Sequence, residues 1–260
     1  MRANYHTHTH RCRHALGTER DYIERALEGG LEILGFSDHA PFEYGEGKKN
    51  YPNVRMQPEE LEGYVAAVSA LKAEYAGRIE LHAGLEAEYY PKLFPRLLEQ
   101  VRALGIEYLL LGQHFLENET GQPYCGAPTE DKRLLDRYVG QSIDGLQTGA
   151  FSCFAHPDLI RYLGDGAEYT RQMRRLCRAA AEAGVPLELN LLGLREGRNY
   201  PDPRFWRIAA EEGAAVILGC DAHRPEYAAD PETEARAMRE FVSVFGLRLT
   251  EEIKYCPFLP

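Results

Sequence analysis

The residues best suited to chemistry in this 260-residue chain are histidines and carboxylates that directly follow short apolar runs. They occur in six motifs, which read, in chain order, HTHTH, SDHA, HAGLE, GQH, AHPD and CDAH. These motifs contain His6, His8, His39, Glu86, His114, His156, Asp221 and His223. Imidazole and carboxylate groups suit Zn²⁺, Fe²⁺ or Mn²⁺ as ligands. The pattern therefore predicts a metal centre rather than a set of isolated core histidines.

The apolar runs that precede these motifs have the length and composition of buried β-strands. Seven strands are predicted, at Arg2–His6, Glu32–Ser37, Ile79–Glu86, Glu107–Gly112, Phe151–Ala155, Pro186–Asn190 and Ala215–Gly219. Helices are predicted between and after them, at Glu19–Glu28, Pro58–Tyr75, Pro91–Leu104, Glu130–Thr148, Glu168–Ala183, Pro203–Glu212 and Glu232–Val244. Such alternation is typical of an α/β fold with a parallel sheet.

The predicted sheet explains how motifs from both ends of the chain could meet. In a parallel α/β barrel the carboxyl ends of all strands form one rim, and active sites form there. Alternate residues of a strand share a face, so HxH and DxH pairs can both point into one cavity. We therefore expect a single domain over residues 1–260, with the metal cluster at the carboxyl rim of its strands.

Composition narrows the class of protein. The net charge of −10 and the pI near 5.5 argue against nonspecific binding of nucleic acid. None of the six cysteines forms a CxxC pair, which indicates reduced thiols and argues against a structural thiolate zinc site. We find no signal peptide and no apolar run long enough for a membrane span. A cytoplasmic protein that binds neither membrane nor nucleic acid is expected, and its oligomeric state is left open.

Taken in order, the six motifs resemble those of the PHP (polymerase and histidinol phosphatase) superfamily, and the resemblance extends from His6 to His223. This resemblance implies a distorted seven-stranded (β/α)₇ barrel, similar to a TIM barrel. It also implies three divalent metal ions, of zinc, iron or manganese. The ligands it implies are His6, His8, Glu86 and Asp221 for the first ion, Glu86, His114 and His156 for the second, and His14, His39 and His223 for the third.

A hydrolytic mechanism follows from that ligand pattern. Two ions bridged by Glu86 could hold a water and lower its pKa, and the resulting hydroxide would attack phosphorus. Glu86 and Asp221 are therefore expected to be catalytic as well as metal-binding. Arginine suits a phosphate dianion because its planar fork donates two parallel hydrogen bonds. By resemblance Arg161 and Arg195 are expected to bind the phosphate, with Arg198 as a rival to Arg195.

Within the superfamily, the freestanding size and the GLR…NYP segment resemble histidinol-phosphate phosphatases. The expected reaction is hydrolysis of L-histidinol phosphate to L-histidinol and phosphate, a step of histidine biosynthesis. Leu191 and Leu192 depart from the threonine, serine or alanine that family members often have there. Two alternatives remain open: a phosphoesterase for a nucleotide, cyclic phosphodiester or sugar phosphate, and a metal-stabilised module without catalysis.

Several further polar residues are ambiguous from sequence alone. His10 shares the alternation of the first motif and could face either the site or a loop, whereas His82 is expected to be a hydrogen-bonded core histidine. Glu88 is a rival carboxylate ligand on the third strand. Asp38 and Asp158 could each orient a ligand or cap a loop. The long segments 41–57 and 115–129 are predicted to be loops that cover the substrate.

Overall fold

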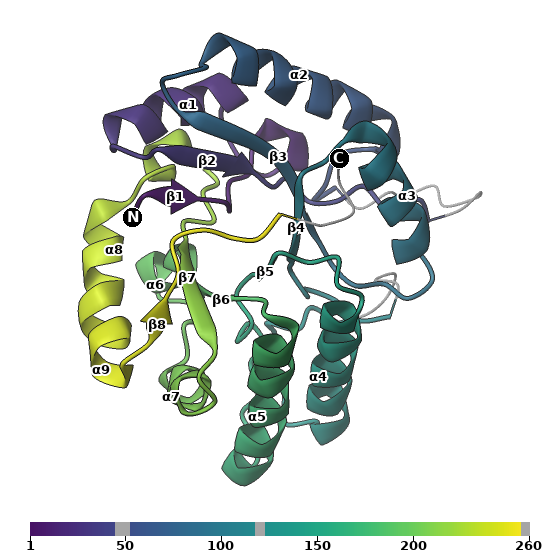
Figure 1. The fold of residues 1–260 in the computed structure, drawn as a ribbon. Coiled ribbons are helices and arrows are strands. Elements are labelled where there is room, and N and C mark those ends of the chain that lie inside the picture. The colour runs from purple at the N-terminus through teal and green to yellow at the C-terminus, as the bar shows by residue number, and fades with distance from the viewer. Residues whose placement is uncertain (45–52, 118–122, 256–260) are drawn as a thin grey trace.

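The computed structural model describes residues 1–44, 53–117 and 123–255, and parts of both predicted loops, 45–52 and 118–122, lie outside that range. One parallel sheet holds its strands in chain order and curls around a central axis (Figure 1). Its eight strands are β1 Ala3–Asn4, β2 Ile33–Phe36, β3 Glu80–Ala87, β4 Tyr108–Leu111, β5 Cys153–Phe154, β6 Leu187–Asn190, β7 Ala215–Gly219 and β8 Arg248–Leu249.

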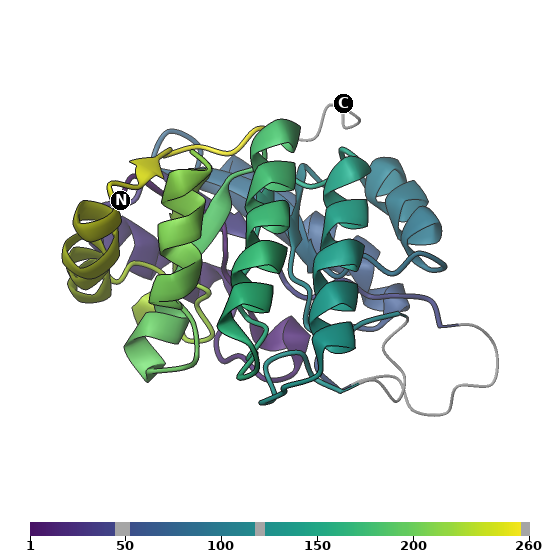
Figure 2. The same cartoon turned by 90° about the horizontal axis from the view of Figure 1, so that it is seen from below.

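Helices cover the outer face of this curled sheet, and α4 and α5 stand side by side in both views (Figures 1 and 2). The α-helices are α1 Glu19–Glu28, α2 Leu61–Glu74, α3 Phe94–Leu104, α4 Lys132–Gln147, α5 Gly166–Ala183, α6 Leu191–Glu196, α7 Pro203–Glu211, α8 Pro231–Ala237 and α9 Ser243–Phe245. Short 3₁₀ turns occur at His10–Cys12, Pro58–Glu60 and Pro225–Tyr227, and a π-helical turn at Met238–Val242 joins α8 to α9. In the described ranges, none of the helices has both the length and the hydropathy needed to cross a bilayer.

Two apolar clusters stabilise the fold, a large one between sheet and helices and a small one inside the curl. The small cluster joins side chains of β1, β2, β4, β5 and β7 to Ile253. The Tyr108 ring occupies the space beside Gly35 and Gly84, where a Cβ would collide with it. Its hydroxyl lies 2.7 Å from the carbonyl oxygen of Tyr5. These contacts fill much of the interior below the rim with apolar and aromatic side chains.

The predicted parallel α/β sheet is confirmed, but the strand count of seven was one too low. The missed strand, β8, has two residues and pairs with the start of β7, through Ala215 and Val216. At the opposite end, the segments that follow β1 and β7 meet directly in a parallel bridge between Thr7 and Ala222. The sheet therefore curls far enough to bring its first and seventh strands together at the rim. This architecture is consistent with a distorted TIM-like barrel.

Candidate active site

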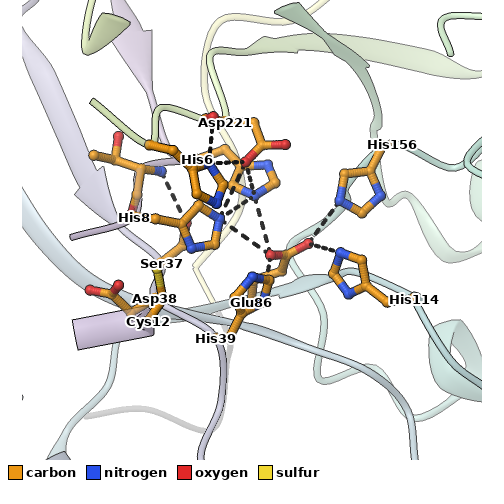
Figure 3. Close-up of polar contacts among 12 residues, drawn as sticks. His6, His8, Cys12, Ser37, Asp38, His39, Glu86, His114, His156 and Asp221 are labelled. Carbon is orange, nitrogen blue, oxygen red and sulfur yellow. Dashed lines mark hydrogen bonds and ion pairs between the residues drawn. The ribbon is translucent and has the colours of Figure 1, made fainter. Parts of the chain in front are cut away.

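Glu86 lies at the centre of the polar cluster on the rim (Figure 3). It stands near the end of β3 and is 1% exposed. Its carboxylate lies across Gly112, where a Cβ would collide with it, so glycine is required at that position. Both carboxylate oxygens are buried, and neither has a hydrogen-bond partner among the described residues. A buried carboxylate without such partners is costly, and a bound cation would compensate for it.

One oxygen of Glu86 faces a first group of ligand-type side chains. Its Oε2 lies 3.3 Å from His8 Nε2 and 3.4 Å from His6 Nε2. Those two ring nitrogens are 3.1 Å apart, and Asp221 Oδ1 lies 3.3 Å from the first and 3.5 Å from the second. Ligands that bind one tetrahedral ion through bonds of about 2.1 Å are roughly 3.4 Å from one another. These four side chains therefore have the spacing of a single metal site.

The other oxygen of Glu86 faces a second group. Its Oε1 lies 2.9 Å from His156 Nε2 and 3.4 Å from His114 Nε2. Each carboxylate oxygen therefore faces a different group, and Glu86 could be shared between them. The structure brings together the residues of the two predicted ligand sets that contain Glu86.

The third predicted set is assembled only in part. His14 Nε2 and His223 Nε2 are 3.0 Å apart and face the same space. His39 lies next to them, with its ring centroid 5.3 Å from that of His14, but its Nδ1 is directed at Glu86 Oε2, 3.0 Å away. His39 also lies with His8 and His223 in one group whose ligand atoms are all within 4.8 Å of one another. The pair His14 and His223 could hold an ion, with His39 between this pair and the central carboxylate.

Two of the ligand-type residues have positive φ angles, which residues other than glycine rarely adopt. His156 has a φ of 31° and Asp221 a φ of 47°. Positive φ is uncommon for residues other than glycine, and such strain is concentrated at functional sites. Both residues come two positions after the end of a strand, where the backbone must turn sharply to direct the side chain into the cluster.

Glu188, on β6, was not predicted, and it orients two of the histidines. His6 Nδ1 donates to Glu188 Oε1 at 2.7 Å, which leaves Nε2 of that ring free to face the cluster. The backbone N–H of His156 donates to the other oxygen at 3.0 Å. Asn190 Nδ2 donates to Glu188 at 2.9 Å and to Asp221 at 3.1 Å. A sequence signal existed, because Glu188 and Asn190 are alternate polar residues within an apolar strand.

Glu88 has a comparable role for His114 and is not itself among the groups around Glu86. His114 Nδ1 and Glu88 Oε1 are 3.0 Å apart, while Nη1 and Nη2 of Arg55 donate to Glu88, at 3.0 and 3.3 Å. Burial raises the pKa of Glu88, but Arg55 and His114 together lower it to about 2. Arg55 is 1% exposed and was also missed, because nothing in its local sequence marks it as buried.

The charges of the cluster favour cation binding. Burial raises the pKa of Glu86, but the surrounding imidazoles, His114 first, hold it well below its usual range. Burial also raises the pKa of Asp221, and His6 and other histidines outweigh that effect in the same way. Burial and two neighbouring imidazoles lower the pKa of His14 to about 4. Burial lowers the pKa of His6 and His8, but the surrounding carboxylates hold it well above its usual range. These side chains bind metals as ionised carboxylates and neutral imidazoles, so a cation would displace protons from His6 and His8.

A cavity of about 540 Å³ opens above the cluster. Its walls include His14, Leu16, His39, Val54, Arg55, Glu88, His114, Phe115, Tyr124, Leu192, Glu196, Arg198, Tyr200, Asp221, His223 and Arg224. A neighbouring hollow of about 450 Å³ shares the Tyr124, Arg198 and Tyr200 walls and adds Arg161. Apolar and aromatic side chains alternate with charged ones in this lining, a mixture that is typical of a small-molecule site.

Of the predicted phosphate-binding arginines, the structure does not bring Arg195 to this cavity. Its guanidinium pairs with Asp230 at 2.8 Å and stacks on the Tyr227 ring at 3.7 Å, on the side of α6 that faces α8. The rival residue, Arg198, lines both hollows. Arg161 reaches only the neighbouring hollow.

The two remaining histidines lie outside the cluster. His10 is exposed, and its Nδ1 donates to the carbonyl oxygen of Gly17 at 3.2 Å, so it belongs to the loop. His82 is buried towards the other end of β3, where it bonds Glu80 and Tyr255 at 2.7 Å each and Glu107 through its second nitrogen. The prediction of a hydrogen-bonded core histidine is confirmed for His82.

Asp38 and Asp158, whose roles the sequence left open, accept hydrogen bonds from loop and helix residues and not from histidine rings. Asp38 accepts hydrogen bonds from the backbone N–H and the hydroxyl of Thr9, both at 2.8 Å, and so fixes the loop that follows His8. Asp158 accepts hydrogen bonds from Trp206 Nε1 at 3.0 Å and from the backbone N–H of Asp202 at 2.6 Å. It therefore anchors the start of α7 beneath the site.

Comparisons with known proteins agree with this geometry. A family model described as the PHP domain matches residues 4–191. A probable histidinol-phosphatase of Deinococcus radiodurans is 33% identical over 85% of this chain and 85% of its own length. A histidinol-phosphatase of Bacillus subtilis is 25% identical over 84% and 92%. The crystal structure of a histidinol phosphate phosphatase from Lactococcus lactis, complexed with zinc, L-histidinol and phosphate, has a TM-score of 0.73 at 19% identity and 95% coverage of both chains, a likeness of fold.

Proposed function

The chain belongs to the PHP domain family, and from this premise we propose that it is a metal-dependent phosphomonoesterase that hydrolyses L-histidinol phosphate to L-histidinol and phosphate. The observation that carries the proposal is the Glu86 cluster, in which ligand-type side chains from distant parts of the sequence meet at the floor of a cavity. The two relatives named as histidinol-phosphatases support the choice of substrate.

The proposed enzyme binds three divalent ions of zinc, iron or manganese. His6, His8, Glu86 and Asp221 would hold the first, Glu86, His114 and His156 the second, and His14, His39 and His223 the third. The fit is supported by the buried oxygens of Glu86, which have no hydrogen-bond partner among the described residues, and by the near-tetrahedral spacing of the first set. When bound, such ions lower the pKa of water and neutralise charge on the phosphoryl oxygens.

The remaining residues orient the ligands and the substrate. Glu188 holds the His6 ring by its Nδ1, and Glu88 faces the Nδ1 of His114, so that each ring presents Nε2 to the cluster. Partners of this kind fix the tautomer and the direction of a metal-binding imidazole. Arg198, which lines the cavity, would donate hydrogen bonds to the phosphate dianion, and Arg161 would assist from the neighbouring hollow.

The decisive experiment compares phosphate release from L-histidinol phosphate with release from a nucleotide monophosphate, a cyclic phosphodiester and a sugar phosphate. Metal-replete protein should have the highest kcat/KM on L-histidinol phosphate, and Asp221→Asn protein should be nearly inactive on all four. A preference for another ester would redirect the proposal to a different substrate. Absence of hydrolysis, together with a melting temperature that falls on chelation, would favour the metal-stabilised module.

A further inference from the structure

Hydrolysis of an alkyl phosphate needs a proton for the departing alcohol oxygen. Side-chain atoms that coordinate a cation carry no proton to give. An alkoxide is comparable in basicity to hydroxide, whose conjugate acid has a pKa of about 15.7. A donor must therefore lie on the cavity wall, be held rigidly, and have a hydrogen that is not committed to another acceptor. Tyr200 meets these conditions.

Tyr200 is fixed between α6 and the cluster. It lines the cavity but is only 2% exposed as a residue. Its ring lies against Gly193, where a Cβ would collide with it, and its centroid is 5.6 Å from that of His156. Close packing on two sides restricts the ring to one orientation, which is what a proton donor requires. Tyr124, the other tyrosine of the wall, is 39% exposed and lacks this restraint.

The hydrogen bond of the Tyr200 hydroxyl has a defined direction. Arg198 Nη1 lies 2.9 Å from Tyr200 Oη. A guanidinium has donors only, so the arginine donates and the phenol oxygen accepts. No acceptor for the hydroxyl's own hydrogen is present in the described ranges of the chain. The hydrogen is therefore available to a ligand in the cavity.

Tyr200 also lies beside the cluster, because its ring packs against that of His156 and because it lines the same cavity as Asp221. A phenol is protonated at neutral pH, so its proton is present for transfer. A phosphate ester bound over the cluster would bring its bridging oxygen to this wall.

We propose that Tyr200 is the acid of the reaction and donates its hydroxyl proton to the oxygen of the departing alcohol. This inference rests on the proposed phosphatase function. As water adds to phosphorus, the bond between phosphorus and the ester oxygen breaks, and its electron pair stays on that oxygen. The oxygen takes the proton of Tyr200, and a proton released from the attacking water restores the phenol. The net change is ester plus water to alcohol plus phosphate.

Arg198 gives this step a second support. The guanidinium that donates to Tyr200 Oη would stabilise the phenolate while the proton is transferred. A positioned acid of this kind contributes about 10²- to 10⁴-fold to a rate. That contribution depends on the leaving group, because a stable phenolate such as p-nitrophenolate departs without a proton. An anchor for the phosphate, in contrast, would act equally on all esters.

The test compares Tyr200→Phe with wild type on L-histidinol phosphate and on p-nitrophenyl phosphate. We expect kcat to fall at least ~100-fold on the alkyl ester and less than ~3-fold on the aryl ester. Metal content and melting temperature should match those of wild type. Tyr162→Phe, which removes a buried hydroxyl from a residue that lines neither hollow, is the matched control and should leave both rates unchanged.

Equal losses on the two esters would overturn the inference, since they would make Tyr200 an anchor for Arg198 and the phosphate. Unchanged rates on both would overturn it as well. If Tyr200→Phe lost its metal, a series of aryl phosphates would decide: the dependence of kcat on leaving-group pKa must be steeper in the variant. Failure of the proposed substrate is a separate result, visible as inactive wild type on L-histidinol phosphate, and any other alkyl phosphate that is hydrolysed then replaces it.

Discussion

Glu86 and His82 lie on the same strand and the same face, yet they belong to regions of different character. At the His82 end, both ring nitrogens have partners, from Glu107, Glu80 and Tyr255. At the rim, the oxygens of Glu86 have no hydrogen-bond partner among the described residues, although five imidazoles surround them. A satisfied polar group stabilises a fold, whereas converging ligand atoms without hydrogen bonds indicate a bound cation. Each of the following predictions tests this difference.

The largest effect is expected at the rim. Glu86→Gln removes the charge that both ion groups share but keeps the size of the side chain. Activity should fall by more than ~100-fold. Loss of a residue that only hydrogen-bonds a metal ligand already costs about 10- to 100-fold in metal affinity or activity, and Glu86 would contact the ions itself. Elemental analysis should show that the variant retains fewer ions than wild type. Wild-type turnover in this variant would contradict the bridging role of Glu86.

Substitution of Glu188, which hydrogen-bonds His6 from outside the cluster, should have an intermediate effect on activity. Glu188→Gln weakens the hydrogen bond that orients His6, and metal affinity or kcat should fall about 10- to 100-fold. Added metal should restore part of the activity, which a defect in folding would not allow. An unaltered metal affinity, measured by competition with a chelator, would separate Glu188 from the site.

The two arginines of the segment that follows β6 should separate by their effect on KM. Arg198→Ala is expected to raise KM about tenfold, since a hydrogen bond to a charged group contributes about 1.5–3 kcal/mol. Arg195→Ala, whose guanidinium pairs with Asp230, should change KM less than twofold. The reverse ranking would restore Arg195 as the phosphate-binding residue.

Substitution of His82, towards the other end of β3, should change activity very little. His82→Gln leaves the rim intact, so kcat/KM should stay within about twofold of wild type. The free energy of unfolding should fall by about 1–3 kcal/mol, because the hydrogen bonds of the imidazole to Glu107, Glu80 and Tyr255 are lost, although Glu107 keeps its contact with Lys72. Denaturant unfolding with and without a chelator gives the comparison, and the loss should be the same in both. A lost activity here would remove the distinction between the two ends.

Much of this cluster could be predicted from sequence because its histidines and carboxylates lie at or just after strand ends. Those strands are continuous apolar runs, and their parallel order brings their ends to one rim. Arg195 and Arg198 could not be separated in this way. They lie three residues apart, and the left-handed Gly197 between them, with a φ of 66°, reverses the chain after α6. Only coordinates reveal that the reversal directs Arg198 to the cavity.

Other features depend on contacts between distant parts of the chain. β8 has two residues and little periodicity, and it pairs because the start of β7 offers a free edge. Arg55 is buried by a partner 33 positions further along, Glu88. Neither β8 nor the burial of Arg55 is marked by a pattern in the neighbouring residues, so the local sequence could not predict them.

The central claim is that ions held around Glu86 are required for phosphate ester hydrolysis. Its most direct test is to strip the protein with a chelator, titrate it with zinc or manganese, and follow bound metal and phosphate release from L-histidinol phosphate together. The account predicts no turnover in the stripped protein and recovery only once at least two ions per chain are bound. Full turnover without metal, or recovery complete at one ion per chain, would contradict it.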